Sequence, residues 1–516
     1  MTLLKRFSFA VAISVVLAFG AQAELWMPSV FTDHMVLQQK SLVPVWGKAA
    51  PGAAVKVAIA DREASATANT QGQWRVKIGP FPAGGPHTLT VTVGEETKTI
   101  NDVLFGEVWV CSGQSNMVWW VNQSNDAEAE IAAANYPNIR LYKAPNVTSD
   151  TPKDDIEAAW AVCAPETVPE FSGVAYYFGR KLHQDLGVPV GLVLSAWGGT
   201  PAEAWTSLPK LQANAEFEPL LARWNDTLAA YPEAKAKFDE ALKAWEAEAE
   251  KAKSEGKEPP AKPRAPMGPD SPHRPANLYN AMINPLIPYG MRGAIWYQGE
   301  SNASRAYQYR ALFADMIKDW RERWGQGAFP FYFVQLANFS TNADTPDGSP
   351  WAELREAQTM ALSLPNTGMA VITDIGDPAD IHPRNKQDVG KRLAQWALRY
   401  TYGRADVPPS GPLYKAMKVL DGGKVSLEFD HVYGGLKAKE GGLAGFTVAG
   451  EDKKFVEAKA EISGDTVHVW SDQVALPVAV RYAWSDNPPA TLYNGADLPA
   501  SPFRTDDWPG VTVENK

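Results

Sequence analysis

The chain has 516 residues and a formal net charge of −10 at pH 7, with 45% hydrophobic and 11% aromatic residues. This balance is typical of a globular protein with two to four domains, at ~100–200 residues per domain. Lysine and arginine do not cluster with aromatic residues, which excludes nucleic acid and anionic membrane surfaces as main partners. Most of the 19 tryptophans suit a core, and the excess weakly favours a protein that handles sugars.

The first residues resemble a secretory signal peptide. Lys5 and Arg6 precede the apolar run Phe7–Phe19, and small residues follow at Ala21–Ala23, which is the order of a charged start, a hydrophobic segment and a cleavage site. The run is shorter than the ~20 residues that a membrane span needs. We therefore expect residues 1–23 to be removed and the protein to be exported, either periplasmic or secreted, without a membrane anchor.

The two ends of the mature chain have the pattern of β-structure. From Glu24 to about Ile100, and again from about Pro408, polar and apolar residues alternate between turns rich in glycine, proline and asparagine. Such alternation indicates antiparallel strands. We predict an N-terminal β-sandwich-like domain over residues 24–103 and a C-terminal one over residues 406–516.

The middle of the chain, residues 104–405, alternates buried strands with amphipathic helices. Five apolar runs look like parallel strands buried on both faces: Glu107–Gly113, Val188–Trp197, Met291–Gly299, Phe329–Phe339 and Thr367–Gly376. Helical periodicity follows in two of the intervening segments, 307–325 and 388–403. This alternation predicts a three-layer α/β/α domain.

One segment of that domain, about 206–275, breaks the alternation. Phe238, Leu242 and Trp245 form a helical stripe, and a proline-rich stretch then excludes further helix. We interpret it as a helical insertion with an extended return. Its charges fit a solvated surface, and a role in shaping a substrate cleft is the alternative.

The two cysteines also leave two alternatives. Cys111 and Cys163 could form a disulfide in an exported protein or stay as buried thiols.

Polar motifs follow four of the five strands. They are "GQSNM", "WGGTPAEAW", "QGESN" and "DIGDPADIHP". Because the carboxyl ends of parallel strands share one edge of the sheet, these motifs are expected to meet in one crevice.

Ser115 and His382 are the candidates for chemistry in that crevice. Ser115 lies in a tight turn after a strand, where a hydroxyl is exposed, although a helix cap there is the plain alternative. His382 is the one histidine of the seven that follows an α/β strand, and Asp377 and Asp380 lie near it. The set Ser115, His382 and Asp380 has the chemical types of a hydrolase triad.

The neighbouring loops offer donors for a tetrahedral oxyanion. The glycine pair that ends at Gly199 allows close approach of the backbone, and the side chains of Gln298 and Asn302 can donate N–H groups. We predict an oxyanion hole from these residues and the N–H of Ser115. Turn geometry and ordinary loop hydrogen bonds are the structural alternative for the same residues.

Residues beside the serine are candidates for substrate contacts. Gln114 and Asn116 flank it, and Trp119 and Trp197 are candidate walls of the cleft. Support of the turn by Asn116, and core packing of at least one tryptophan, are the alternatives.

Two other functions fit parts of the same pattern. A glycosidase needs two carboxylates ~5–9.5 Å apart, and Glu203 and Glu300 both follow strands. A non-catalytic carbohydrate-binding protein would use the flanking β-domains instead. Nothing in the sequence requires the pair of Glu203 and Glu300 specifically, and a structural hydrogen bond is the alternative for Glu203.

Four motifs, "GQSNM", "WGGTPAEAW", "WYQGESN" and "DIHPRNKQDVGKRL", together with "LYNAMINPL" and the terminal "LYNGADLPASPFRTDDWP", closely resemble the sialate O-acetylesterase family of SGNH/GDSL hydrolases. The likeness covers nearly the whole mature chain. It implies a flavodoxin-like catalytic domain between two β-domains. It also implies a serine esterase that removes O-acetyl groups from carbohydrate without a metal or other cofactor.

The resemblance also implies roles for particular residues. It makes Ser115 the nucleophile and His382 the base, and it assigns the oxyanion to the N–H of Ser115, to Gly199 and to a polar group in "QGESN". The wider superfamily usually has aspartate three residues before the histidine, where this chain has Ala379. Asp380, Asp377 or a backbone carbonyl is left to orient His382. Acetylated sialic acid and acetylated plant polysaccharides such as xyloglucan or xylan fit equally well as substrates, and the oligomeric state is open.

Overall fold

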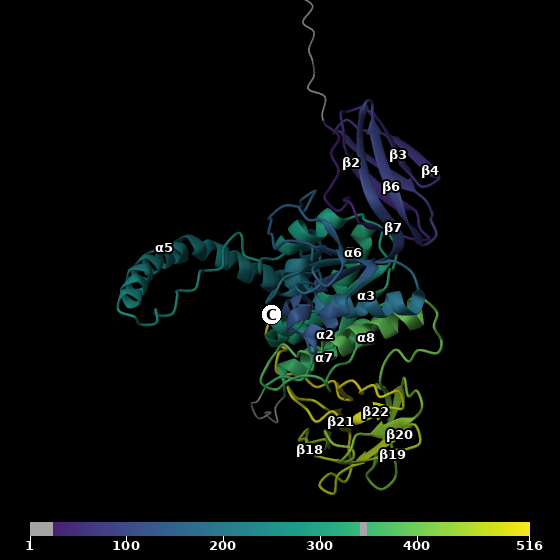
Figure 1. Ribbon diagram of the computed structural model, residues 1–516. Coiled ribbons are helices and arrows are strands. Elements are labelled where there is room, and N and C mark those ends of the chain that lie inside the picture. The colour runs from purple at the N-terminus through teal and green to yellow at the C-terminus, as the bar shows by residue number, and fades with distance from the viewer. Residues whose placement is uncertain (1–23, 341–347) are drawn as a thin grey trace, which may run out of the picture.

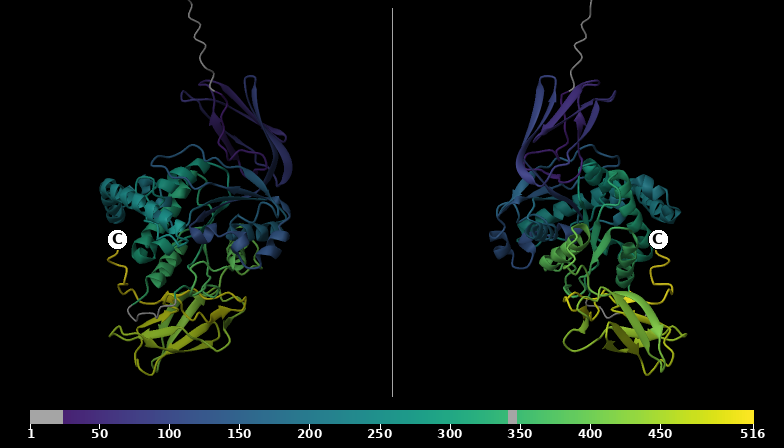
Figure 2. Two further views of the ribbon diagram at one scale, coloured as in Figure 1. Left: turned by 60° about the vertical axis from the view of Figure 1, so that its left-hand side comes forward. Right: turned by 90° about the vertical axis from the view of Figure 1, so that its right-hand side faces the viewer.

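The computed structural model describes residues 24–340 and 348–516; the expected signal peptide, residues 1–23, lies outside them. Figure 1 and Figure 2 show the N-terminal strands at one end of the molecule, the C-terminal strands at the other, and an α/β region between them. A long helical arm projects from the side of the α/β region in Figure 1. Within the described residues no helix is both long and apolar enough to span a bilayer.

The central sheet has the strand order β13-β12-β11-β7-β10-β8-β9. The five expected strands are present in it: β7 (Glu96–Gly113), β10 (Val190–Ala196), β11 (Gly293–Tyr297), β12 (Phe331–Val334) and β13 (Thr367–Ala370). All neighbours among these five pair in parallel. Two further strands were not anticipated: β8 (Tyr136–Lys143) continues the parallel order, and β9 (Trp160–Cys163) ends it antiparallel.

Helices cover both faces of this sheet. Among them are α3 (Gly173–Leu186), α6 (Ala306–Trp324) and α8 (Lys386–Trp396). Tyr332 of β12 packs against Trp396 of α8, with ring centroids 6.5 Å apart, whereas its neighbour Phe333 packs against Phe313 of α6 at 5.0 Å. Since successive residues of a strand point to opposite faces, α8 and α6 lie on opposite sides of the sheet. The region is therefore a three-layer α/β/α structure, as expected.

Strand β7 joins the N-terminal strands to the central sheet. Its first part pairs antiparallel with β6 (Gly84–Val93), and its second part pairs in parallel with β10 and β11. The expected boundary between residues 103 and 104 therefore falls inside one strand. The other N-terminal strands are β1 (Val36–Gln38), β2 (Val43–Lys48), β3 (Ala54–Ile59), β4 (Arg62–Thr67) and β5 (Gln73–Ile78). Their buried side chains belong to the same hydrophobic core as the central sheet.

The C-terminal strands have a hydrophobic core of their own, which includes Val425, Leu427 and Phe429 at alternate positions of one strand. One four-stranded sheet contains β14 (Leu413–Val419), β15 (Val425–Asp430), β20 (Thr466–Trp470) and β19 (Lys459–Ser463). A second contains β18 (Val456–Glu457), β17 (Phe446–Ala449), β21 (Ala479–Tyr482) and β23 (Phe503–Arg504), and β16 (Leu436–Ala438) pairs with β22 (Leu492–Asn494).

The arm is helix α5 (Glu218–Ser254) with its proline-rich return. Only Leu220 and Ala249 of the helix are buried, which fits the solvated surface expected from its charges. Trp245 Nε1 donates to the Pro260 carbonyl at 2.8 Å, so the return folds back on the helix. The remaining α-helices are α1 (Ser115–Val118), α2 (Ala127–Ala132), α4 (Leu208–Gln212) and α7 (Pro350–Met360).

The two cysteines do not pair. Cys111 and Cys163 are both free and buried. Burial raises the pKa of both thiols, that of Cys163 to about 12. Each thiol therefore behaves as a small apolar side chain of the core.

Candidate active site

The turn after β7 exposes Ser115. Gly113 has φ +141°, and a Cβ on it would lie 2.1 Å from the Tyr297 carbonyl oxygen of β11, so only glycine fits where the two strands pack. The chain then turns through Gln114 into α1, which begins at Ser115. An apolar strand thus ends directly in a half-buried hydroxyl at the carboxyl edge of the sheet.

Ser115 and His382 meet at this edge. The Ser115 hydroxyl and His382 Nε2 are 2.9 Å apart, although the residues are 267 positions apart in the chain. Asp380 Oδ1 accepts the backbone N–H of His382 at 2.8 Å and lies 3.5 Å from His382 Nδ1. Asp377 instead accepts the backbone N–H of Ala379 at 2.9 Å. Of the two carboxylates, Asp380 is therefore the one beside the imidazole.

Two buried polar side chains fix the backbone on both sides of His382. Asn116 donates to the Ile381 carbonyl at 3.0 Å, and Lys386 Nζ donates to the Pro383 carbonyl at 2.6 Å. Lys386 also donates to Asn116 Oδ1 at 2.6 Å. No sequence pattern marks Lys386 as part of the site, because one lysine in the first turn of a polar helix has the pattern of a solvated residue.

The same cluster determines the charge around the imidazole. Burial lowers the pKa of His382, and Lys386 lowers it further, while Asp380 acts in the opposite direction. Burial also lowers the pKa of Lys386 to about 7 and raises that of Glu300, whose Oε1 accepts from Asn116 at 2.6 Å. The ring of Trp119 stacks on His382 with centroids 5.2 Å apart. Together these groups favour a neutral, well-oriented imidazole.

The glycine loop after β10 lies against the serine. A Cβ on Gly198 would be 3.3 Å from Ser115 Cβ, and Gly199 has φ +73°. Among the described residues the backbone N–H groups of Ser115 and Gly199 have no hydrogen-bond acceptor. Both donors are therefore available beside the hydroxyl.

Gln298 and Asn302 are placed differently. Gln298 is fully buried, and its Nε2 donates to Asn302 Oδ1 at 2.6 Å and to the Thr200 carbonyl at 3.3 Å. Asn302 is 1% exposed and donates to Glu203 at 2.9 Å. These amides support the loop that carries Gly199, and the structure does not bring them to the serine as free donors.

The predicted substrate contacts divide in the same way. Asn116 is buried, and Gln114 Oε1 accepts the backbone N–H of Ser301 at 3.2 Å, so both stabilise the loops around the serine. Trp119 and Trp197 are partly exposed. The backbone N–H of Trp197 donates to the Gly113 carbonyl at 3.1 Å, which keeps this tryptophan next to the turn that carries Ser115.

A cavity of about 360 Å³ adjoins Gly199. Its lining includes, besides Gly199 itself, the following residues: Glu203, Arg223, Trp224, Met267, His273, Ser301 and Arg305. Arg223 and Trp224 come from α5, and His273 of the proline-rich return contacts the Gly199 carbonyl at 2.9 Å through Nε2. The insertion thus forms one wall of the cavity that adjoins Gly199.

The carboxylates considered for a glycosidase have structural partners. Glu203 accepts from Arg305 at 2.6 Å and from Asn302 at 2.9 Å, and it is 5% exposed. Glu300 accepts from Asn116, as described above. Among the described residues no group of three or more histidine, cysteine, aspartate or glutamate side chains could hold a metal ion.

A serine hydroxyl in contact with an imidazole at the carboxyl edge of an α/β sheet is the arrangement that hydrolases with a serine–histidine pair use. The family model described as "carbohydrate esterase, sialic acid-specific acetylesterase" matches residues 270–399. The chain is 30% identical to the sialate O-acetylesterase of Mus musculus over 92% of its length and 93% of the relative, and 29% identical to that of Homo sapiens over 93% of each.

A solved structure agrees with these relatives. The crystal structure of a carbohydrate acetylesterase from Xanthomonas citri is 40% identical and superposes with a TM-score of 0.79, covering 94% of this chain and all of the other. The chain belongs to the sialate O-acetylesterase family. It is accordingly a carbohydrate O-acetylesterase.

Proposed function

We propose that the enzyme removes acetyl groups from sugar hydroxyls through an acetyl-serine intermediate, with Ser115 as nucleophile and His382 as general base. The observation that carries the proposal is the 2.9 Å contact between the Ser115 hydroxyl and His382 Nε2. This distance lies within the range for proton transfer between a nucleophile and its base.

In the first half of the reaction His382 takes the proton of Ser115 while Oγ attacks the acetyl carbonyl carbon. The tetrahedral intermediate collapses as His382 returns the proton to the departing sugar oxygen, which leaves acetyl-Ser115 and a free sugar hydroxyl. In the second half His382 takes a proton from water as the water oxygen attacks the acetyl carbon, and it returns that proton to Ser115 Oγ as the intermediate collapses to acetate and the free serine hydroxyl. Asp380, close to Nδ1, favours the tautomer with the accepting nitrogen toward Ser115.

We assign the oxyanion hole to the N–H groups of Ser115 and Gly199. Both lack an acceptor among the described residues, whereas the amides of Gln298 and Asn302 are occupied. Main-chain donors with fixed positions stabilise the oxyanion without reorganisation, and each is worth ~10²–10³ in rate.

We assign the sugar to the cavity beside Gly199. A volume of about 360 Å³ is within the range of small-molecule sites, and Trp224 offers an aromatic face to a sugar ring. The arginines Arg223 and Arg305 also line it. A sugar with a carboxylate, such as the sialic acid in the names of the curated relatives, suits these arginines, and acetylated xyloglucan or xylan is the competing substrate.

Release of acetate by the Ser115→Ala variant tests the mechanism. We expect a loss of at least ~10³-fold in kcat/KM on an aryl acetate, with unchanged circular dichroism. Full activity of the folded variant would exclude Ser115 as nucleophile. Acetate release from 9-O-acetylated sialoside and from acetylated hemicellulose, measured side by side without change in glycan chain length, identifies the substrate and separates an esterase from a glycosidase.

We further propose that the catalytic domain is flavodoxin-like and that the protein is exported. The parallel order of the central sheet supports a flavodoxin-like SGNH catalytic domain with β-sandwich-like domains on both sides. The pattern of residues 1–23 supports export to the periplasm or beyond. Sequencing the N-terminus of the protein purified from its native host tests export, with Glu24 as the expected first residue.

A further inference from the structure

A second cavity lies at the opposite edge of the central sheet from Ser115. It has a volume of about 380 Å³ and is lined by the β2–β5 strand pair together with residues 153–154 and 284–288. Residues 284–288 precede β11, whereas the "QGESN" loop of the candidate active site follows it. The two sites therefore lie toward opposite ends of that strand, which is ~17 Å long for five residues at ~3.3 Å each.

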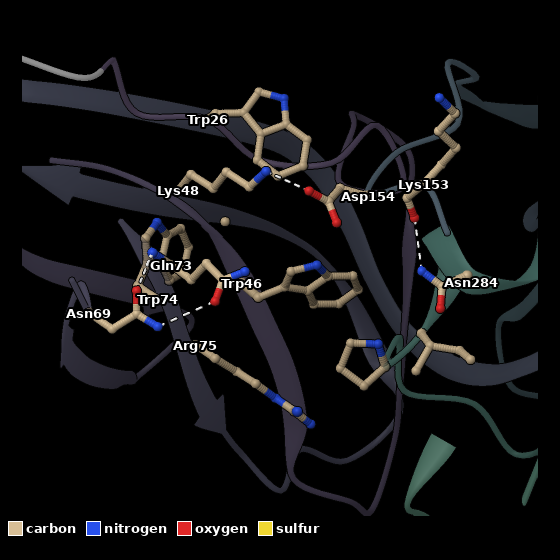
Figure 3. Close-up of a pocket in the computed structure, with 13 residues that line it drawn as sticks. Trp26, Trp46, Lys48, Asn69, Gln73, Trp74, Arg75, Lys153, Asp154 and Asn284 are labelled. Atoms are coloured by element: carbon tan, nitrogen blue, oxygen red, sulfur yellow. Dashed lines mark hydrogen bonds and ion pairs between the residues drawn. The ribbon is translucent and has the colours of Figure 1, made fainter. Parts of the chain in front are cut away.

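Three tryptophans line this cavity: Trp26 and Trp46 are partly exposed, whereas Trp74 is 3% exposed and belongs to the hydrophobic core behind it. Figure 3 shows the indoles of Trp26, Trp46 and Trp74 around a common space. Gly47 makes the arrangement fit, because a Cβ there would lie 2.1 Å from the Trp26 carbonyl oxygen and 2.8 Å from the Trp74 ring. Trp26 can therefore pair with Lys48 through two backbone hydrogen bonds of 2.9 Å. The indole nitrogen of Trp74 is buried and has no hydrogen-bond partner among the described residues.

Polar groups line the rest of the cavity and give it positive charge. Lys48 pairs with Asp154 and lies 5.1 Å from the Trp26 ring centroid. Arg75 has neither an ion pair nor a hydrogen bond among residues 24–340 and 348–516, and partial burial lowers its pKa. With Lys153, three cations and one anion line the cavity of a protein whose net charge is −10.

Such a lining favours one class of ligand. The C–H faces of a pyranose ring are apolar and flat enough to stack on indoles, while its hydroxyls need donors and acceptors at the rim. Asn69, Gln73 and Asp154 can supply those. A guanidinium that lacks a partner is best satisfied by a carboxylate, which it can bind through two parallel hydrogen bonds.

We propose that this cavity is a second, non-catalytic carbohydrate site that binds an acidic pyranose unit of a glycan, with Trp26 and Trp46 beside the ring and Arg75 on its carboxylate. The site would hold a glycan on the enzyme while the acetylated unit reaches Ser115. It does not depend on the proposed chemistry at Ser115, since binding is measured without turnover.

Calorimetric titration of the full-length protein with unacetylated oligosaccharides tests the site. The acidic probes are sialyllactose and a glucuronic-acid-bearing xylo-oligosaccharide, and the neutral controls are lactose and plain xylo-oligosaccharide. We expect at least one acidic probe to bind about tenfold more tightly than its neutral control. The probe that binds identifies the acidic sugar. Equal affinity for acidic and neutral probes, or no binding up to about 10 mM, would overturn the proposal.

Variants locate the binding. Arg75→Gln should lower the affinity for the acidic probe about tenfold. Lys77→Gln, on the same exposed face of β5 but outside the cavity, should leave that affinity unchanged. Trp46→Ala should remove binding of the probe. If the Trp46→Ala variant does not fold, the Arg75→Gln result alone decides whether the site exists. Both variants should keep full activity on an aryl acetate. Binding that survives Arg75→Gln but is lost in Trp224→Ala would place the sugar in the cleft beside Ser115 and refute the second site.

Discussion

His382 is held in place through its neighbours in the chain as much as through its own ring. Asn116 and Lys386 bind the carbonyls of Ile381 and Pro383, and Trp119 stacks on the imidazole. The ring contacts Ser115 on one side and Asp380 on the other. Side chains that act only by orienting a base can be worth as much in rate as a direct contact, because misplacement by about 1 Å costs ~10²-fold.

The pH dependence of activity tests the electrostatics of this cluster. The base is neutral imidazole, so kcat/KM should fall as the pH falls through the pKa of His382, and burial and Lys386 place that pKa below the ordinary value of 6.5. Lys386→Met removes a positive charge and should move this acidic limb to higher pH, with a lower plateau because the Pro383 carbonyl loses its donor. Arg384→Met, an exposed cation two residues away, should leave the limb in place. An unmoved limb in the Lys386 variant would contradict the electrostatic contact.

Substitution of Asp380 distinguishes a Ser115–His382–Asp380 triad from a Ser115–His382 dyad. Its carboxylate lies 3.5 Å from His382 Nδ1, longer than a strong hydrogen bond, and also accepts the backbone N–H of His382. We expect Asp380→Ala to lower kcat on an aryl acetate by ~10²-fold or more if the triad operates. Asp377→Ala, which removes a contact to Ala379 alone, is the matched control. A loss below tenfold would leave Asp380 with only a structural role.

At the scale of elements, the ends of the strands are predictable and the loops between them less so. The apolar runs of β7, β10 and β11 stand out because they are buried on both faces. Strand β8 begins with Tyr136, Pro137 and Asn138, and only its later residues are buried, so no continuous apolar run marks it. The meeting of Ser115 and His382 followed from the edge rule for parallel strands. The burial of Lys386 and the internal use of Gln298 depend on side-chain packing, which periodicity does not report.

Helix α5 should contribute to binding the sugar part of the substrate and not to the reaction of the acetyl group. Trp224, near its start, lines the cavity beside Gly199, so Trp224→Ala should lower kcat/KM on an acetylated glycan about tenfold, as for loss of one aromatic contact of ~1.4 kcal/mol. Activity on a small aryl acetate should not change. Trp245→Ala, farther along the same helix and facing the proline-rich return, should change neither. Equal losses of kcat/KM on both substrates would mean that Trp224 stabilises the loop that carries Gly199.

At the scale of the whole molecule, the pattern of polar and apolar residues along the chain predicted three regions but not how they join. Alternating residues marked the N-terminal strands, yet β7 runs from them into the central sheet without interruption, and the two regions share one core. A sequence pattern changes from alternating to uniformly apolar at such a point whether or not the strand ends there. The sequence pattern could not predict the cavity lined by Trp26, Trp46 and Trp74 either. Its lining comes from separate strands and a loop, and only the folded structure brings them together.

The C-terminal tail should contribute to the stability of the whole molecule through Glu353 of α7. This carboxylate is 2% exposed and accepts the backbone N–H groups of Val511 and Thr512 as well as the Thr512 hydroxyl. Removing residues 510–516 leaves the buried carboxylate without these donors, which should lower the free energy of unfolding by about 2–3 kcal/mol. Urea unfolding followed by tryptophan fluorescence measures the loss. In a Glu353→Met background, where no charge is left unpaired, the same truncation should cost less than half as much. An equal cost in both backgrounds would show that the tail stabilises the protein through its other contacts and not through Glu353.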